Sequence, residues 1–354
     1  MPQRFGQEQP PAHLWASDRS LREWVPLRGG FSGARIYRCH WADQSQTLLR
    51  AWPPGSCPER VAHVQQWITA TRQAGCKLLP CFYPADNGST IAHYSGRLWE
   101  MRDWIGGCPW AASVGQPPVH VALRCAANAL GQFHAATSTL PGRRACAPAI
   151  VDRLRKAKQW TSQDVLNWSR FPAGCVDWMS QAASSLQLVW NRRGKELSTQ
   201  LAEAATQTWD LRFCLRDVHL DNILFSGDRV TGLIDFDTLR VDTPAVDLAR
   251  LVHSFAMQTN PRTTNLTEIQ DWRRQIDQQY WPIALAGMAS FCPLHDSEAE
   301  LARVLADATA IFSLLNWLEW GRQRSDNGDR DPWLLPLAQQ RIDDLCRFAV
   351  NYFL

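Results

Sequence analysis

One short stretch of the chain concentrates side chains that can do chemistry. Residues 214–225 read CLRDVHLDNILF, with an arginine, two aspartates, a histidine and an asparagine within seven positions, directly before an apolar run. The hairpin pattern NILFSGDRVTGLIDFD follows, turned at Ser-Gly-Asp, and Asp235 ends its second strand. Antiparallel pairing would bring Asn222 close to residue 232. We therefore expect Asp217, Asn222 and Asp235 to converge.

Carboxylate and amide oxygens are the ligands that Mg²⁺ prefers, and protein-bound Mg²⁺ usually shares its shell with phosphates. A further carboxylate that does not bind the metal can orient an attacking hydroxyl. These are the roles that phosphoryl transfer needs. The competing interpretation is a polar turn that is crowded without chemical purpose.

The elements on the N-terminal side read mostly as strands. Residues 23–52 have the pattern of β-strands on either side of the polar turn ADQSQ, and Pro53-Pro54 end the pattern. A helix is predicted from Pro58 to Gly75, because apolar residues recur at helical spacing between them. LLPCFY, STIAHY and RLWEMRDWI read as further strands. The order suits a small α+β domain.

Beyond IGGCPW at residues 105–110 the pattern becomes helical. PVHVALRCAANALGQFHAAT predicts a long amphipathic helix closed by Pro141-Gly142, and residues 150–210 predict two or three more. IFSLLNWLEW at 311–320 is apolar on nearly every side, which favours a buried helix. A chain of 354 residues is long enough for two domains.

Composition excludes some classes of protein. Apolar residues make up 45% of the chain and charged residues 20%, and the net charge of +3 is too small to indicate nucleic acid or an anionic membrane as partner. The eleven cysteines form no C-x-x-C pair, as in a reducing compartment. The first residues lack an apolar signal segment, and we expected no membrane span. We expect a cytoplasmic protein; its oligomeric state is not indicated.

The motifs RDVHLDNILF, GLIDFD and PAVDLARL together resemble the D-x-H-x-x-N and I-D-F/W-[DE] signatures of the aminoglycoside phosphotransferase and choline kinase group of small-molecule kinases, which are relatives of protein kinases. GGFSGARIYR resembles their glycine-rich loop, LLRAW their nucleotide-binding strand, LWEMRDWIGG their hinge and LGQFHA a helix motif. The resemblance implies an α+β, bilobal protein-kinase-like fold. Residues 1–105 would form a small antiparallel-sheet N-lobe and residues 106–354 a mainly helical C-lobe. ATP and Mg²⁺ are the implied cofactors, although GTP also fits.

Carried over by position, the resemblance implies that Asp217 is the catalytic base toward the acceptor hydroxyl. Asn222 and Asp235 would bind the metal, and Asp247 would brace the loop through its backbone. Arg50 would contact the α- and β-phosphates. The remaining implied residues cover the phosphates (Gly30, Ser32 and Gly33) and hold the adenine through their backbone (Asp103 and Ile105).

The sequence also departs from the family pattern. Leu215-Arg216 replace the usual His-Gly before Asp217, and only eleven residues separate Asp235 from Asp247, which leaves no room for a peptide-docking loop. Arg50 stands where a lysine is usual, so the phosphate geometry must differ.

Three supporting residues have two interpretations each. Glu59 could pair with Arg50, or, as an acidic residue in the first turn of its helix, it could interact favourably with the helix dipole. His219 is interpreted as a hydrogen-bonding residue of the loop, with proton transfer as its alternative. His134, on an apolar helix face, is interpreted as a core histidine.

Two further functions compete with a kinase. GGFSGA is one glycine short of G-x-S-x-G, so Ser32 could be the nucleophile of a hydrolase, but a strand follows where that motif needs a helix. A non-catalytic, pseudokinase-like module that binds nucleotide or a partner is the other alternative. The acceptor stays open among aminoglycosides, choline, ethanolamine, homoserine, thiamine and sugar alcohols.

Overall fold

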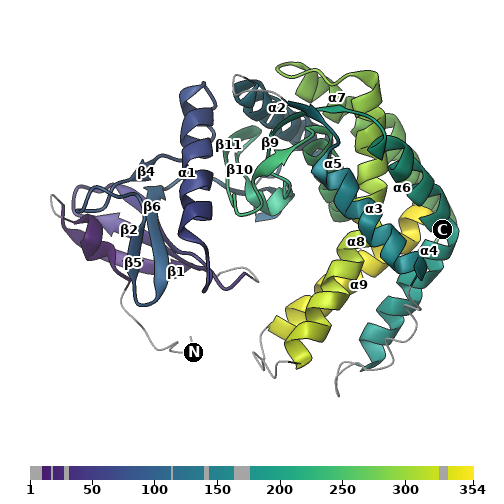
Figure 1. The fold of residues 1–354 in the computed structure, drawn as a ribbon, viewed down its shortest axis with the longest axis horizontal. Coiled ribbons are helices and arrows are strands. Elements are labelled where there is room, and N and C mark those ends of the chain that lie inside the picture. Colours follow the sequence, from purple (N-terminus) through teal and green to yellow (C-terminus); the bar gives the residue numbers. More distant parts are fainter. Residues whose placement is uncertain are drawn as a thin grey trace. The chain divides into compact units, whose positions relative to one another are not determined.

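The computed structural model describes residues 10–16, 19–27, 32–112, 115–138, 143–162, 176–326 and 334–354 (Figure 1). The chain divides into two compact units. We call Met1–Gly107 together with Thr231–Ile234 the N-terminal unit, and Cys108–Val230 together with Asp235–Leu354 the C-terminal unit. We expected the boundary after residue 105, and the N-terminal unit ends its first segment at Gly107. The sequence did not indicate that residues 231–234 also belong to this unit.

The N-terminal unit is built on an antiparallel sheet of order β1-β2-β3-β6-β4, with β5 also paired to β6. Its strands are β1 (Leu21–Leu27), β2 (Arg35–Trp41), β3 (Gln46–Ala51), β4 (Phe82–Tyr83), β5 (Ala92–Tyr94) and β6 (Arg97–Asp103). Burial alternates along β2, so that Tyr37, Cys39 and Trp41 face one apolar cluster with Leu49 and Met101. This is the period-2 pattern that the sequence predicted.

Helix α1 (Pro58–Gln73) is the one long helix among the described residues of this unit. Proline at its first position fits an N-terminus, since that amide has no partner within a helix. Val61, Val64 and Ile68 are buried at helical spacing. The helix ends before Gly75, whose φ of +115° is open to glycine and strained for other residues.

The C-terminal unit contains two three-stranded sheets, of order β11-β10-β7 and β12-β9-β8. The strands are β7 (Cys108–Pro109), β8 (Arg143–Ala145), β9 (Trp209–Cys214), β10 (Ile223–Ser226), β11 (Arg229–Leu233) and β12 (Arg240–Asp242). The hairpin β10–β11 was expected from the sequence. Strands β7, β8, β9 and β12 were not, because each of them pairs with a segment at least 26 positions away in the chain.

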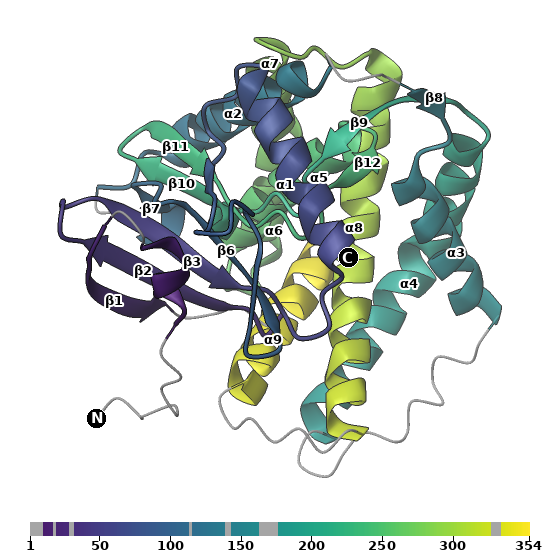
Figure 2. The ribbon, with the colours of Figure 1, turned by 60° about the vertical axis from the view of Figure 1, so that its left-hand side comes forward.

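Helices form most of this unit. They are α2 (Val119–Thr137), α3 (Pro148–Ser162), α4 (Val176–Ala205), α5 (Ala245–Gln258), α6 (Leu266–Gln275), α7 (Trp281–Ala289), α8 (Asp296–Asp326) and α9 (Leu334–Phe353), with a π-helical turn at Ile276–Tyr280. Helices α4, α8 and α9 pack against one another, and α5 packs on α8 (Figure 2). The Pro141-Gly142 stop that we expected after α2 lies outside the described residues.

Glycines allow α2 and α7 to approach closely. A Cβ on Gly131 would lie 2.6 Å from the carbonyl oxygen of Met288, and one on Gly287 would lie 2.8 Å from the Cβ of Ala127. Side chains larger than hydrogen would push the helices apart. The contact fixes α2, which carries His134 toward the candidate site.

Helix α8 is longer than the sequence suggested, since only residues 311–320 stood out there. Among the described residues, its stretch Asp296–Trp320 has the length and composition of a membrane-crossing helix. Of the 18-residue segment within it that meets this description, 67% is buried inside the protein. A buried core helix has the same properties.

The fold class predicted from the sequence is confirmed: a small antiparallel sheet with one long helix precedes a mainly helical unit.

Candidate functional site

The Asp217 loop, which we define as Leu215–Asn222, joins β9 to β10. Pairing of β9 with β8 and β12 fixes where the loop begins, and a single 3₁₀ turn, Leu220–Asn222, leads into β10. Arg216 has a φ of +64°, a left-handed conformation that is uncommon for residues other than glycine. Such backbone strain is found mostly where the surrounding structure enforces it, as at functional sites.

One face of α5 holds this loop at three points. Asp247 is fully buried, and its two carboxylate oxygens accept the backbone amides of Leu215 at 2.8 Å and Arg216 at 2.6 Å. One turn later Arg250 donates to Asp217, and one turn further Ser254 Oγ accepts the amide of Leu220 at 3.0 Å. The spacing i, i+3 and i+7 puts all three side chains on the same helix face.

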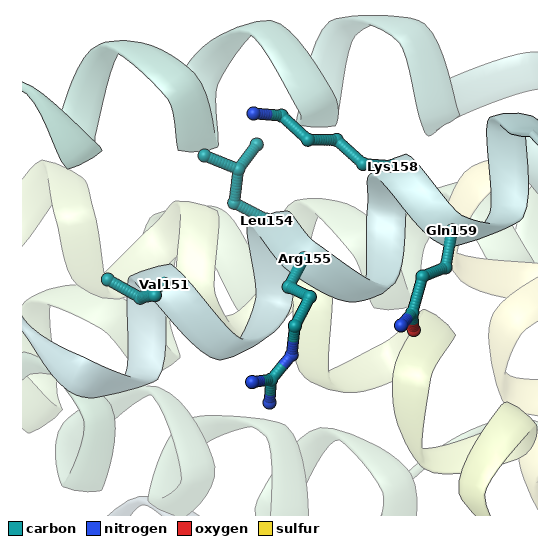
Figure 3. A pocket seen from close by; sticks show the side chains of 5 residues that line it. All are labelled: Val151, Leu154, Arg155, Lys158 and Gln159. Atoms are coloured by element: carbon teal, nitrogen blue, oxygen red, sulfur yellow. The ribbon is translucent and has the colours of Figure 1, made fainter.

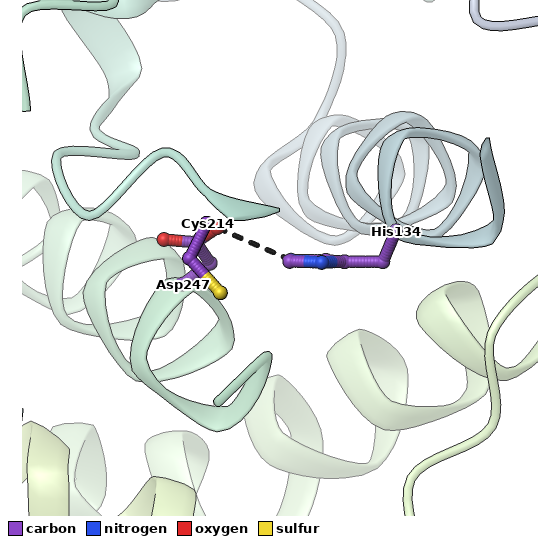
Figure 4. Close-up of side chains that lie close together, drawn as sticks. All are labelled: His134, Cys214 and Asp247. Atoms are coloured by element: carbon purple, nitrogen blue, oxygen red, sulfur yellow. Dashed lines mark ion pairs between the residues drawn. The ribbon is translucent and has the colours of Figure 1, made fainter. Parts of the chain in front are cut away.

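A buried histidine stands behind Asp247. His134 Nε2 of α2 lies 3.1 Å from Asp247 Oδ2, and Cys214 at the end of β9 completes the group (Figure 4). The three ligand atoms lie within 4.8 Å of one another, a spacing that could hold a metal. Here, however, burial raises the pKa of the Cys214 thiol well above its usual value, and both oxygens of Asp247 already accept amides. We interpret the group as a brace for the loop.

Asp217 is half-buried and interacts through both oxygens. Oδ1 accepts from Nε and Nη2 of Arg250 at 3.2 and 3.1 Å, and Oδ2 lies 3.6 Å from His219 Nε2. Burial acts to raise the pKa of Asp217, but the interactions with His219 and Arg250 outweigh it and hold the pKa below its usual range. Asp217 is therefore ionised at neutral pH.

His219 and Asn222 shape the loop from within. The side-chain amide of Asn222 donates to the carbonyl oxygen of Asp217 at 3.0 Å and lies 3.0 Å from His219 Nε2. His219 Nδ1 lies 3.5 Å from Asp221 Oδ2. Because the Asn222 nitrogen is used in this way, its Oδ1 points elsewhere, and no described residue donates to that oxygen. It is free to bind a cation.

Asp235 follows β11 and is exposed, with a φ of +62°. The chain after it is tied to the Asp217 loop, since Thr238 Oγ1 donates to the carbonyl of Leu215 at 2.6 Å and β12 then pairs with β9. Asn222 and Asp235 offer an amide and a carboxylate oxygen, which are ligands that fit Mg²⁺. The distance from Asp235 to Asn222 and Asp217 stays a prediction.

Arg50 lies on β3 directly opposite Glu100 on β6. Arg50 Nη1 is 4.0 Å from Glu100 Oε1, both side chains are buried, and the guanidinium lies 4.4 Å from the centre of the Trp52 ring. Trp52 Nε1 and Gln65 Nε2 of α1 each donate to Glu100 Oε2 at 2.9 Å. Glu100 therefore joins two strands and one helix.

Glu59 is not the carboxylate that this network uses. It is exposed in the first turn of α1 and accepts a hydrogen bond from the thiol of Cys57. The structure thus favours the helix-terminus interpretation of Glu59, and Glu100 supplies the buried negative charge beside Arg50. Sequence reasoning missed Glu100 because it treated residues 97–105 only as a hinge strand.

The remaining residues predicted to bind nucleotide belong to the N-terminal unit. Gly30 lies outside the described residues. Ser32 is exposed and its Oγ accepts the amide of Ala34 at 3.4 Å; Gly33 has a φ of +79°, and its carbonyl accepts from Arg97 at 2.9 Å. These contacts order the end of the glycine-rich segment.

Asp103 ends β6, and its carboxylate accepts from the amide of Cys81 and the hydroxyl of Tyr83, at 2.9 and 2.8 Å. Its own amide donates to the carbonyl of Cys81, so an adenine contact from Asp103 would have to use its carbonyl. Ile105 is half-buried and packs on Gly232, where a Cβ would lie 2.5 Å from its Cγ2.

A hollow on the C-terminal unit lies along one face of α3 (Figure 3). Val151, Leu154, Arg155, Lys158 and Gln159 line it. None of them belongs to the Asp217 loop or to the residues that brace it, and we assign no role to this hollow.

The fold is that of the small-molecule kinases. The chain is similar to an amicoumacin kinase in complex with AMP-PNP and Ca²⁺, with 13% identity, a TM-score of 0.60 and coverage of 94% of this chain and 91% of the other. It is similar to a spectinomycin phosphotransferase in complex with ADP and spectinomycin (11% identity, TM-score 0.56, 93% and 92% covered). It is also similar to an aminoglycoside phosphotransferase from Alicyclobacillus acidocaldarius, with 16% identity, a TM-score of 0.52 and coverage of 97% of this chain and 92% of the other.

The model of the phosphotransferase enzyme family matches residues 23–282, and the chain belongs to that family. The family that we named from the motifs is thereby confirmed. No curated protein sequence matches the chain.

Sequence reasoning missed several residues that now surround the predicted ones. They are Glu100 and Gln65 beside Arg50, and Arg250 and Ser254 around the Asp217 loop. His134 was expected as a core histidine and is fully buried. The signal for Arg250 and Ser254 was present, since both stand at helical spacing from Asp247 in PAVDLARLVHS. The contact of His134 with Asp247 joins residues 113 positions apart and left no local signal.

Proposed function

We propose that the protein transfers a phosphoryl group from ATP to a hydroxyl of a small molecule. The observation that supports this best is the state of Asp217, an ionised carboxylate in a loop held at three points by α5, in a chain of the phosphotransferase enzyme family. A loop that was only a polar turn would not need a buried brace under its backbone.

The acceptor hydroxyl would donate its hydrogen bond to Oδ2 of Asp217, because Oδ1 is occupied by Arg250. The hydroxyl oxygen then forms a bond to the γ-phosphorus while the bond to the β–γ bridging oxygen breaks, and ADP leaves with the electron pair. A carboxylate with a lowered pKa is a weak base, so Asp217 acts mainly by orienting the hydroxyl and takes the proton late.

On the nucleotide side, Arg50 would bind the α- and β-phosphates. Its buried position beside Glu100 and Trp52 restricts the guanidinium to few orientations. Mg²⁺ would be held by Asn222 Oδ1 and Asp235 and would offset the charge of the phosphates. Backbone amides around Gly30, Ser32 and Gly33 would cover the phosphates, and Asp103 and Ile105 would flank the adenine.

The replacement of His-Gly by Leu215-Arg216 is compatible with activity. Arg216 Nε lies 3.4 Å from Asp242 Oδ2 and its Nη2 lies 3.6 Å from Asp152 Oδ2, so its side chain is used away from Asp217. The alternative, a relative that binds nucleotide without transferring phosphate, is separated from an enzyme by the following experiment.

Asp217→Asn and Asp235→Asn are compared with the unchanged protein in the presence of ATP and Mg²⁺ and a panel of hydroxyl compounds. We expect each variant to lower turnover by about 10² to 10⁴. Release of ADP gives the rate, and phosphorus NMR identifies the phosphorylated product. The control is Asp228→Asn in the exposed turn between β10 and β11, which should keep full activity.

Equal turnover in the Asp217→Asn variant would contradict the proposal. Binding of ATP with Mg²⁺, but no acceptor-dependent ADP release from the unchanged protein, would favour the non-catalytic alternative.

A further inference from the structure

The carboxylates around the Asp217 loop already have basic partners. The pairs in the described residues are Asp217 with Arg250, Asp221 with His219, and Asp152 and Asp242 with Arg216. A polycationic acceptor such as an aminoglycoside needs carboxylates that are not yet neutralised. Each of these four carboxylates already has a basic partner among the described residues.

A second arginine lies near Arg250. His253 of α5 and Phe348 of α9 make an edge-to-face contact with ring centres 4.7 Å apart, which packs the two helices together. Arg250 stands one turn before His253, and Arg341 stands two turns before Phe348, on the same helix face. Arg341 is half-buried, and no described residue forms an ion pair with it.

The basic groups on these two helices act on one another electrostatically. Burial, and next the charge of Arg250, lower the pKa of Arg341. Burial, and then Arg250 and Arg341, hold the pKa of His253 well below its usual value. Asp217, Asp221 and Asp344 also face Arg341 and act to raise its pKa, but they already pair with Arg250, His219 and Arg347.

We propose that Arg250 and Arg341 form an anion-binding side of the acceptor site, so that the acceptor carries a carboxylate or a phosphate close to its reacting hydroxyl. The proposal rests on the proposed function, since it places the acceptor at Asp217. Two guanidinium groups suit this role because each presents a planar fork of donors that matches a carboxylate or phosphate. The anion would occupy the arginines while Oδ2 of Asp217 receives the hydroxyl.

The test measures binding of four small hydroxyl compounds to the protein saturated with AMP-PNP and Mg²⁺. Glycerate and glycerol 3-phosphate carry the two anionic groups, choline is cationic and glycerol is neutral. Calorimetry should show at least one anion binding about tenfold more tightly than choline and glycerol. Which anion binds better distinguishes a carboxylate from a phosphate acceptor.

Variants identify the arginine that is responsible. Arg341→Gln should weaken anion binding about tenfold or more, and Arg341→Lys should keep part of it, because the charge remains but the fork is lost. Arg274→Gln is the control, since Arg274 lies on α6 and forms an exposed pair with Asp271. It should bind the anions as the unchanged protein does.

Three results would overturn the inference: choline binding as tightly as both anions, unchanged anion binding in both Arg341 variants, or no anion binding up to about 20 mM. Transfer from ATP is measured on the same samples. Phosphorylation of choline without anion binding would keep the kinase activity and reject the anionic acceptor. Anion binding that depends on Arg341, with no transfer to any hydroxyl, would support the anion site and contradict the kinase activity.

Discussion

Asp247 illustrates how much of the candidate site depends on a residue that touches no substrate. Its carboxylate is fully buried, accepts the amides of Leu215 and Arg216 and faces His134. Without it, two buried amides would lose their partners in a segment where Arg216 already has a left-handed backbone. Removing one oxygen here therefore acts on the whole loop.

Asp247→Asn should destabilise the protein by about 2–4 kcal/mol, since an NH₂ group would then face a backbone amide. We expect urea unfolding to show this loss and turnover of the folded fraction to fall as well. Asp271→Asn is the matched control, because Asp271 forms an exposed i, i+3 pair with Arg274 and should change stability little. An Asp247→Asn variant as stable as that control would show that the brace is dispensable.

Among the elements, α5 and the strands β9 and β12 position the Asp217 loop, yet the sequence predicted them unevenly. The long helices and the hairpin β10–β11 follow from local periodicity and turn residues, which single sequences carry well. Strand β9 pairs with β8, more than sixty residues earlier, and with β12. Such short strands depend on partners that no local pattern reveals.

The residues of the candidate site likewise divide into those that a local motif predicts and those that depend on distant pairing. Asp217, Asn222, Asp235 and Asp247 could be proposed because they stand in compact motifs. Glu100 could not, because its connection to Arg50 arises from the register of β3 on β6, which turns a residue fifty positions away into a direct neighbour. Motif spacing can predict which residues of one loop act together. Which charged residues of two strands lie opposite each other depends on the register of the sheet.

Glu100→Gln tests the role of the β3–β6 pair. Arg50 and Arg102 would lose the buried negative charge that lies 4.0 and 3.9 Å from them, so we expect a loss of about 2–4 kcal/mol in unfolding free energy. A freer Arg50 should also weaken binding of ATP, measured by calorimetry. Gln65→Ala should give a loss of about 2 kcal/mol without removing the charge beside Arg50, because it removes a hydrogen bond to Glu100 and another from the hydroxyl of Thr90.

Glu59→Gln is the control for this series, because Glu59 is exposed and its carboxylate accepts a hydrogen bond from the thiol of Cys57, away from Arg50. Its stability and ATP binding should match those of the unchanged protein. Weaker ATP binding in Glu59→Gln than in Glu100→Gln would mean that α1 provides the functional partner of Arg50 after all.

At the scale of the whole molecule, composition gave no hint of the arginines that gather beside the Asp217 loop. The net charge is only +3 over 354 residues, while Arg250 of α5 and Arg341 of α9 act on each other. Cysteine use, by contrast, is a property of the entire chain. The ten described cysteines are free thiols, and several are core residues of one unit or the other.

Thiol reactivity therefore reports on both cores at once. Burial raises the pKa of Cys39 to about 12 and of Cys76 to about 11, and that of Cys214 well above its usual value, so these thiols stay protonated as the pH rises from about 7 to 9. Because the thiolate is the reactive form, iodoacetamide should leave them unmodified over this range while it alkylates the exposed Cys57 and Cys81. Peptide mass spectrometry after timed labelling measures each site, and labelling in urea should modify all five. Alkylation of Cys39 or Cys76 in the folded protein at the rate of Cys81 would contradict the packing of the N-terminal unit, and the same result for Cys214 would contradict the brace behind the Asp217 loop.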